Sequence, residues 1–235
     1  MADRQKFYWM FILVRLIALS IGLPVAAEIN IRGELAAVVE GFNAQVRQLR
    51  IEETASIAAF NDFIRGHLST HWDTEQMAMH LLGSEIYQDL SLVQQHRIQQ
   101  SLETTFYRYA YEIMDEYKQT PLLLVDDLVQ DEKGRLRIKI RGKPQGLPML
   151  TGELYLSVEV DDWNIIDAGY AGLTYTALKR STYRRKFNRS GADGLTAWLD
   201  RKNQRFFADY CTPELSIVMP FAVQTLCAKL NRAGL

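Results

Sequence analysis

The spacing of apolar residues changes abruptly at Thr120-Pro121, and this change constrains the fold more than any other feature of the chain. Before it, residues 91–117 repeat apolar side chains every three or four positions, which is typical of one face of a helix. After it, residues 136–141 and 153–160 alternate apolar and polar side chains, as half-buried strands do. Helices, then a meander of strands, and then further helices predict a fold of the α+β class.

Three further helical segments are expected before the strands. Residues 33–50 and 53–68 each carry one apolar stripe with helical spacing, and a shorter segment runs from Trp72 to Gly83. An antiparallel sheet of about four strands should follow, with an apolar face that the N-terminal helices cover. The first stripe consists of Leu35, Val38, Phe42, Val46 and Leu49, and the expected strands are residues 122–130, 136–141, 153–160 and 163–168.

The N-terminus has the pattern of an export signal. Basic residues precede an apolar run from residue 7 to residue 23, and the small residues before position 28 suit cleavage after Ala27. A retained membrane anchor is the alternative, but the run is barely long enough and Arg15 would be costly inside a bilayer. We therefore predict a cleaved signal peptide at residues 1–27. Its removal takes away three basic residues and one acidic residue, so the formal charge of −1 becomes −3, and neither value favours nucleic-acid binding.

Two cysteines, Cys211 and Cys227, could form a disulfide in an exported protein. Thr212-Pro213 has the pattern of a helix start, and a straight helix from there would hold the cysteines roughly 20 Å apart. A disulfide needs Cα atoms within about 7 Å, so only a break in this helix, for example at Pro220, would allow the bond. The sequence leaves the pairing open.

Residues 163–199 contain an ordered series of aromatic, acidic and glycine residues. The series predicts a strand that ends in Asp167, a glycine turn, a basic and aromatic helix, a second glycine turn and a short apolar helix. Its members are Trp163, Asp167, Gly172-Leu173-Thr174, Tyr183-Arg184, Phe187, Gly191, Asp193-Gly194-Leu195 and Leu199. With this spacing the segment resembles, without a gap, the C-terminal half of the MlaC family, periplasmic phospholipid-shuttle proteins also known for toluene tolerance.

The resemblance covers about residues 35–205. It implies a strongly curved sheet wrapped by helices, with an apolar lipid pocket between the layers. We therefore expect a lipid-binding domain at residues 28–205, followed by a helical extension at residues 206–235 that has no counterpart in the family. An apolar stripe in this extension could pack on the body of the protein, cap the pocket or bind a partner, and packing is the preferred interpretation.

The same resemblance implies a function. Members of the family are carriers, not enzymes, and need no cofactor; they hide acyl chains and move phospholipid between the inner and outer membranes. The implied partners are an inner-membrane ABC transporter with a ring-forming MCE component and an outer-membrane lipoprotein–porin complex, and we expect a periplasmic monomer. Two alternatives remain: a carrier of another apolar lipid, such as a hopanoid, and a periplasmic interaction or assembly protein with a solid core.

The candidate residues of the tail pocket come from the apolar faces of helices and strands. Burying one methylene is worth ~0.8 kcal/mol, so a sixteen-carbon tail carries roughly 12 kcal/mol of exposure cost in water. Recognition should therefore depend on the tails, with weak selectivity for the headgroup. Each candidate could equally belong to an ordinary packed core, which is the default for protein interiors. The candidates are Met77, Leu81, Leu82, Phe106, Tyr109, Ile113, Leu154, Leu156, Val158, Ile166 and Leu173.

Six basic residues gather between positions 179 and 189, on the helix expected after the first glycine turn. They could contact lipid phosphate or an acidic docking surface on a partner, or they could form an ordinary solvated helix face. Arg180, Arg184 and Arg185 are the candidates for partner docking. Arg184 alone among the six lies in the family pattern, where it could hold the helix against the sheet.

Neither catalysis nor metal binding is indicated. His67 and His71 have the spacing of two ligands on one helix face, but no third ligand accompanies them. The chain contains no Gly-x-Ser-x-Gly motif, no phosphate-binding glycine loop and no Cys-x-x-Cys pair, so we predict no catalytic residue, no metal site and no cofactor. Asp167 follows two apolar residues and should make structural hydrogen bonds at the sheet edge.

Overall fold

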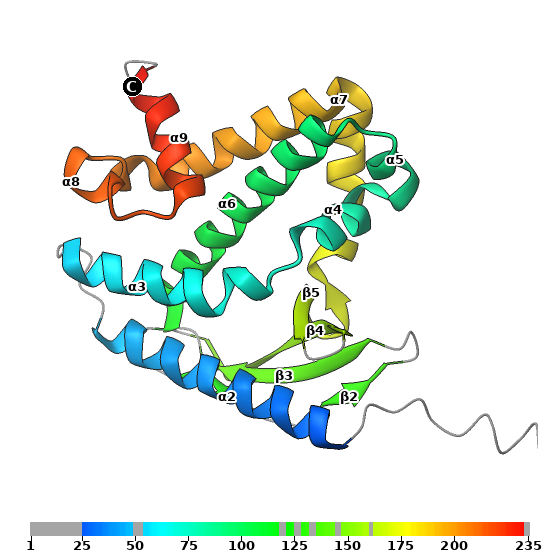
Figure 1. The fold of residues 1–235 in the computed structure, drawn as a ribbon, viewed down its shortest axis with the longest axis vertical. Coiled ribbons are helices and arrows are strands. Elements are labelled where there is room, and N and C mark those ends of the chain that lie inside the picture. The colour runs from blue at the N-terminus through cyan, green and yellow to red at the C-terminus, as the bar shows by residue number, and fades with distance from the viewer. Residues whose placement is uncertain are drawn as a thin grey trace, which may run out of the picture.

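The strands of the protein lie in one sheet in the middle of the chain, and helices precede and follow them (Figure 1). The computed structural model describes residues 25–48, 54–117, 121–124, 128–131, 135–143, 147–159 and 162–232. Residues 1–24 of the predicted signal peptide lie outside this range, so that peptide stays a prediction. The elements are α2 (Val25–Gln48), α3 (Thr54–His67), η1 (Ser69–His71), α4 (Thr74–Leu82), α5 (Ser84–Gln88), α6 (Leu92–Tyr117), β1 (Leu123–Leu124), β2 (Val129–Gln130), β3 (Leu136–Gly142), β4 (Leu150–Glu159), β5 (Asp162–Tyr170), β6 (Leu173–Thr174), α7 (Tyr175–Phe207), η2 (Ala208–Tyr210), α8 (Pro213–Ser216) and α9 (Phe221–Arg232).

The sheet is antiparallel and open, as the alternating pattern predicts, and the α+β class is confirmed. It has six strands in the order β1-β3-β4-β5-β6, with β2 also paired to β3, against the four expected. The additional strands are short. The expected strand 122–130 is two strands, because β1 pairs with residues 140–141 of β3 whereas β2 pairs with residues 136–137 of the same strand. Strand β6 was not expected because it is only two residues long.

A register shift bends the sheet between β4 and β5. Tyr155 faces Asp167, but the next residue of β4, Leu156, faces Ile165, so β5 has one extra residue at this point. Such a bulge bends its strand and increases the local twist. It also interrupts the strict alternation of β5, and Ile165, Ile166 and Asp167 are all buried in succession. The curved sheet that the family resemblance implied is therefore produced in part by this irregularity.

Helix α7 consists of two arms that meet at a kink. Gly191 has φ 64° and ψ −169°, a left-handed backbone conformation that glycine adopts without steric cost, and it divides the helix into residues 175–190 and 192–207. The sequence predicts this turn correctly. In Figure 1 the first arm leads away from the sheet, and the second arm turns back alongside α6.

Buried hydrogen bonds attach the first arm of α7 to the sheet. Asp167 is 1% exposed, and its carboxylate accepts hydrogen bonds from the Thr176 backbone N–H at 3.2 Å and from the Thr176 hydroxyl. The Thr174 hydroxyl caps the same helix by accepting from the Ala177 N–H at 3.2 Å. The structural role predicted for Asp167 is confirmed, and the bonds fix where α7 begins.

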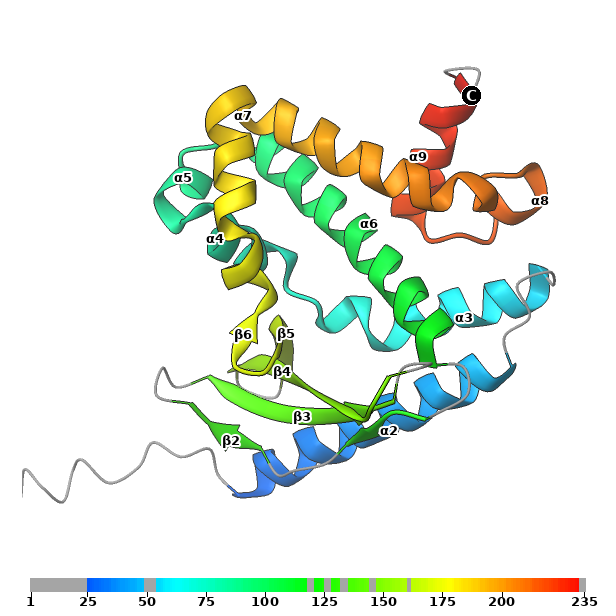
Figure 2. The same cartoon turned by 180° about the vertical axis from the view of Figure 1, so that it is seen from behind.

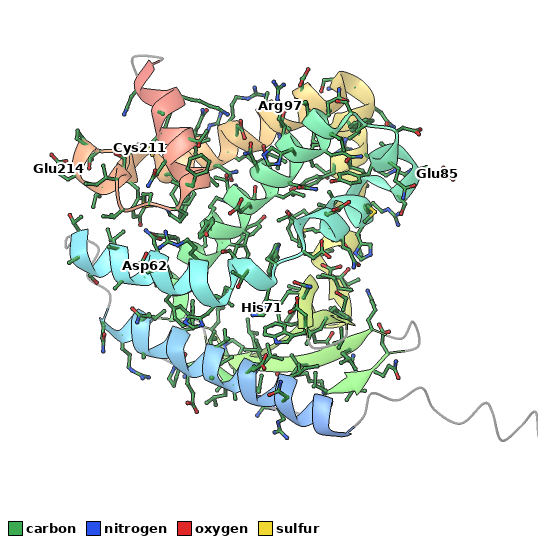
Figure 3. The ribbon with its side chains drawn as sticks, viewed as in Figure 1. Asp62, His71, Glu85, Arg97, Cys211 and Glu214 are labelled. Atoms are coloured by element: carbon green, nitrogen blue, oxygen red, sulfur yellow. A yellow bond between two sulfur atoms is a disulfide. The ribbon has the colours of Figure 1, made fainter. Side chains whose placement is uncertain are left out.

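Aromatic stacking attaches the N-terminal helices to the same sheet. The Trp163 indole N–H donates to the Glu34 carboxylate of α2 at 2.7 Å, and the Trp163 ring stacks on His71 with centroids 3.9 Å apart. Figure 3 shows His71 at this junction between the end of α3 and the strands. Trp72-Asp73 continues the junction, because the Asp73 N–H donates to the Ile165 carbonyl at 3.0 Å.

The C-terminal extension packs on the helices, as preferred from the sequence, but it is not one straight helix. It breaks after α8 and resumes as α9 at Phe221, next to Pro220. The break brings the Cys211 and Cys227 Cα atoms within 5.1 Å, and the two cysteines form a disulfide (Figure 3 shows Cys211 beside α9). The pairing that the sequence left open is thus formed, through the break near Pro220 that it required.

Candidate functional site

A cavity of about 510 Å³ lies where α2, α6 and the first turn of α7 meet the sheet. This volume falls within the usual range for ligand sites in proteins. The wall is almost entirely apolar. It is formed by Leu35, Val38, Val39, Phe42, Leu68, Trp72, Met77, Leu102, Thr105, Phe106, Tyr109, Ala110, Glu112, Leu122, Ile140, Leu154, Ile165, Ala168, Tyr175 and Lys179.

The cavity separates three packed clusters of the interior. One joins α2, α3, α6 and α9, a second joins α4, α6 and α7, and a third joins α2 to the sheet. The cavity wall takes residues from all three: Phe42 from the first, Met77 from the second and Leu35 from the third. The interior is therefore not one continuous packed core, because the clusters meet around a space that their side chains leave open.

The apolar stripe of α2 forms one whole side of the cavity. The spacing of Leu35, Val38, Val39 and Phe42 brings these side chains to one helix face. The position of α2 is fixed at both ends of this stripe. Glu34 binds the Trp163 indole, and Asn43 binds both backbone groups of Leu122 at 2.8 Å each. The stripe is visible in the sequence through its spacing of three to four residues, but it was not predicted to line the pocket.

Aromatic rings form the opposite side and hold one another in place. Trp72 lies against Phe106 with ring centroids 4.2 Å apart, and Tyr109 packs edge-on against Tyr175 at 5.7 Å. Aromatic pairs at these distances stabilise a fixed arrangement beyond their simple burial. The Tyr175 hydroxyl is within 2.9 Å of the Tyr183 hydroxyl. This side of the wall therefore has a defined shape.

Tyr175 of this wall and its neighbour Tyr183 remain uncharged at neutral pH. Burial raises the pKa of Tyr183 to about 12, and burial also raises the pKa of Tyr175, with the neighbouring Tyr183 and Tyr109 hydroxyls acting in the same direction. A phenol that loses its proton only in strong base presents an apolar ring and a neutral hydroxyl. The cavity can therefore accept a hydrocarbon chain without exposing it to charge along the wall.

Ionic side chains occur at two positions of the described cavity wall. Of the lining residues, Glu112 of α6 and Lys179 of α7 alone are ionic, and both are at least partly exposed. Lysine commonly lays its methylene stem on apolar surface and keeps its ammonium in water. We infer that these two residues mark the end of the cavity that faces solvent.

Four of the eleven candidate residues from the sequence line this cavity: Met77, Phe106, Tyr109 and Leu154. Whether they contact a ligand stays a prediction. The side chain of Ile113 lies outside the described residues. The other candidates are placed elsewhere, and the reasons are physical.

Leu81 and Leu82 are buried in the packed cluster of α4, α6 and α7, because they face the kinked helix and not the sheet. Leu156 and Val158 pack in the cluster between α2 and the sheet, beyond the register shift. Ile166 is buried, but the bulge makes its neighbour Ile165 the residue that lines the cavity. Leu173 is 56% exposed, because β6 is an edge strand at the surface.

The three docking candidates lie on the exposed surface of the first arm of α7: Arg180, Arg184 and Arg185. Arg184 does not hold the helix against the sheet. Its guanidinium lies over the end of α4, where a side chain at Gly83 would meet it at 3.6 Å. A cation is favourable at the C-terminus of a helix, so the arginine of the family pattern stabilises the contact between α4 and α7.

The C-terminal extension contributes nothing to this cavity within the described residues, since no lining residue follows Lys179. It borders a second depression of about 490 Å³ between α6, the second arm of α7 and α9. This depression is polar and contains ion pairs, for example Arg97 with Asp193 at 3.1 Å and Lys229 with Asp200 at 3.2 Å. Figure 3 shows Arg97 on α6, away from the sheet.

The histidines of the sequence analysis do not come together. The His67 ring packs against Phe63 at 5.0 Å, whereas His71 stacks on Trp163. Across the described part of the chain, no three side chains of the kinds that bind metals are grouped together. The helices described here also include none that is both long and apolar enough to cross a bilayer.

A comparison with protein-family models matches residues 37–201 of this chain to the MlaC protein family. The chain belongs to the MlaC family. The match covers well over half of the chain and includes every residue that lines the cavity except Leu35. A comparison with curated proteins finds no relative.

Among solved structures, the fold is similar to a phospholipid-binding protein from Ralstonia solanacearum, determined in complex with a phospholipid. The two structures agree with a TM-score of 0.58 over 77% of this chain and 98% of that one, at 13% sequence identity. At this identity the likeness establishes the shared fold of the MlaC-type domain.

Proposed function

We propose that the protein is a phospholipid carrier that encloses acyl chains in the cavity between α2, α6 and the sheet. The observation that carries this proposal is the wall itself: among the described residues it is almost entirely apolar, and its only ionic members are Glu112 and Lys179. A phospholipid has the same division, with apolar tails and a charged headgroup. Membership of the MlaC family and the fold shared with a phospholipid-binding protein support the proposal.

The cavity would supply what a lipid lacks in water. A tail of about sixteen carbons costs roughly 12 kcal/mol to expose, so a free lipid leaves a membrane very rarely. Burial of the tail against aliphatic and aromatic side chains offsets this cost, while the headgroup stays at the ionic end. No bond is made or broken in this cycle, and we propose a carrier and not an enzyme.

The family and the N-terminal sequence support a cellular location and a set of partners for this carrier. We propose that a signal peptide at residues 1–27 directs the protein to the periplasm, where it exchanges phospholipid between the inner and outer membranes. Its proposed partners are the inner-membrane ABC transporter with its MCE component and the outer-membrane lipoprotein–porin complex.

Lipid content is the direct test of the carrier. Mature protein purified from cells without added detergent is extracted with organic solvent, and the extract is analysed by mass spectrometry. Phospholipid in a fixed ratio to protein is expected. A polycyclic lipid in its place would indicate a carrier of another class, and an empty protein would favour the interaction or assembly alternative.

Docking is tested separately. Arg185 is exposed on the first arm of α7, whereas Arg184 contacts the end of α4. Arg180→Glu combined with Arg185→Glu should weaken binding to an immobilised MCE component at least several-fold, because two charges are reversed. The lipid content of the same variant should not change. Unchanged binding would count against this face as the docking surface.

A further inference from the structure

Three cations from three separate segments converge beside the ionic end of the cavity. Arg108 belongs to α6, Lys179 to the first arm of α7 and Lys202 to the second arm. Seen from behind, α6 lies in the angle between the two arms (Figure 2). We call this group, Arg108 with Lys179 and Lys202, the cationic corner.

Contacts across the angle connect Arg108 to the second arm of α7 and to the cavity wall. The Arg108 Nη1 donates to the Asn203 side-chain oxygen at 3.2 Å, so Arg108 is held next to the residue that follows Lys202. Its guanidinium also lies 4.7 Å from the centre of the Tyr109 ring, which lines the cavity. Lys179 is itself part of the cavity wall, one helical turn after Tyr175. Two of the three cations are therefore attached directly to the wall.

Lys202 is connected to the same wall through a row of aromatic rings. Its ammonium lies 4.3 Å from the centre of the Trp198 ring, and Trp198 packs edge-on against Tyr183 at 5.5 Å. The Tyr183 hydroxyl in turn contacts that of Tyr175, which lines the cavity. Burial lowers the pKa of Lys202, and the positive charges of Arg108 and Lys179 lower it further. Arg108 and Lys179 thus both act on Lys202.

The corner has too little negative charge of its own. Glu112 lies 3.3 Å from the Arg108 Nε. Neither Lys179 nor Lys202 has an ion-pair partner within the described part of the chain. The nearest acid along the second arm, Asp200, is already bound to Lys229 and to the Ser101 hydroxyl. Among the side chains that the structure describes, three cations therefore face one carboxylate, and this excess is relieved when an anion binds.

We propose that the cationic corner binds the headgroup of the lipid whose tails occupy the cavity, and that it selects headgroups with a net negative charge over zwitterionic ones. The inference rests on the proposed function. A phosphodiester carries one negative charge, which Lys179 and Lys202 attract. An ethanolamine or choline ammonium on the same phosphate would lie among cations and be repelled, whereas a glycerol headgroup would not. The tails still supply most of the affinity, and the corner biases which lipid is retained.

The test compares two lipids with the same tails. Purified protein is incubated with vesicles of equimolar dioleoyl phosphatidylglycerol and dioleoyl phosphatidylethanolamine, separated from them, and extracted for mass spectrometry. The ratio of bound phosphatidylglycerol to bound phosphatidylethanolamine should be about three- to ten-fold above the same ratio in the vesicles, as expected for two partly exposed charge contacts. The Lys179→Gln, Lys202→Gln double variant should return the ratio to near one while binding the same total lipid.

A matched control is available on the same two arms. Arg189→Gln with Arg201→Gln removes the same number of charges, and both residues are exposed. This variant should keep the ratio of the unmodified protein. If both double variants lost the preference for phosphatidylglycerol equally, the cause would be a general charge effect, and the proposal would be overturned. An unmodified protein that binds both lipids at the vesicle ratio would also overturn it, whereas one that binds neither would contradict the carrier function itself.

Inorganic phosphate distinguishes a headgroup site from a general anion site. A tethered headgroup has a high effective concentration at the corner, so phosphate at matched ionic strength should leave the ratio within about two-fold of its value in chloride. A ratio that falls to one in phosphate but not in chloride would assign the corner to free anions and overturn the headgroup assignment.

Discussion

Helix α6 faces a filled interior along one part of its length and a hollow one along the next, although its apolar stripe continues unbroken. Ile98 is 1% exposed in the cluster that α6 forms with α4 and the second arm of α7. Two turns later, Phe106 and Tyr109 line the cavity. The stripe itself is the same kind of surface in both places. Whether the interior is filled depends on what faces the stripe.

In the filled part, small residues allow close approach. Ala78 of α4 and Ala192 at the start of the second arm of α7 are both buried in this cluster. In the hollow part, the curved sheet faces α6 and diverges from it, with α2 along the side. Close helix packing fills space more completely than a bent sheet opposite a straight helix. The difference predicts responses of different size to the same kinds of mutation.

The largest expected effect is on stability in the filled part. Leu81 is 0% exposed, so Leu81→Ala should leave a void and lower the free energy of unfolding by about 2–5 kcal/mol. Leu154→Ala in the cavity wall should cost less than half of this, because the removed atoms already border an open space. Urea denaturation of delipidated protein measures both. Equal losses would show that the two parts are packed alike.

The next effect concerns the filled cluster at the opposite end of α6. Cys211 and Cys227 are separated by 16 residues and hold α9 against this cluster. Cys211→Ser with Cys227→Ser should lower the free energy of unfolding by about 3 kcal/mol, because the unfolded chain regains the freedom of an open loop. Lipid content should be unaffected, since the extension does not line the cavity. Reduction of the unmodified protein provides the control, and loss of lipid in either case would connect the two regions.

The third effect separates the wall from the core on a single strand. Leu154→Trp should project into the cavity and reduce the bound phospholipid several-fold, with little change in the melting temperature. Leu156, two residues later, is 0% exposed and lies in the packed cluster. Leu156→Trp should therefore overpack the core and cost about 1–3 kcal/mol of stability. If Leu154→Trp unfolded the protein instead, its site would be core and not cavity.

Periodicity predicted most of the fold, because it depends on local spacing. The helix limits near Ser91 and Tyr117, the turn at Gly191 and the alternation of β3 were all expected. Two features depend on tertiary pairing and could not be read in this way. The register shift at Tyr155 arises only when β4 meets β5, and the disulfide needs a break in the C-terminal helix that Pro220 alone does not establish.

The cavity shows the same limit of prediction from local spacing. Apolar periodicity identifies which side chains face inward, and Met77, Phe106, Tyr109 and Leu154 were selected in this way. It does not distinguish Leu81, which faces another helix, from Met77, which lies one turn earlier on α4 and borders the open space. That distinction depends on the divergence of the sheet from α6, which no single segment encodes.

The smallest expected effect is a pH dependence in the filled part. His80 of α4 is half-buried, and this burial lowers its pKa below 6.5; Asp167 and Asp73 oppose the shift, whereas Arg135 and Arg180 add to it. The unfolded chain therefore takes up a proton near pH 6.5 that the folded protein binds only at lower pH. The free energy of unfolding that His80 contributes is therefore fully present above pH 6.5 and falls as the pH is lowered below this value.

His80→Gln should make the loss of stability at low pH less steep. His67→Gln serves as the control because the His67 side chain is exposed on α3. Urea midpoints between pH 7.5 and about pH 5.5 compare the two variants with the unmodified protein, and carboxylate titration, which is common to all three, cancels in the differences. A His80→Gln slope equal to that of the control would mean that His80 is as well solvated as a surface histidine. The packing of α4 against α7 would then be looser than that of the filled cluster described here, and the contrast with the cavity would be correspondingly weaker.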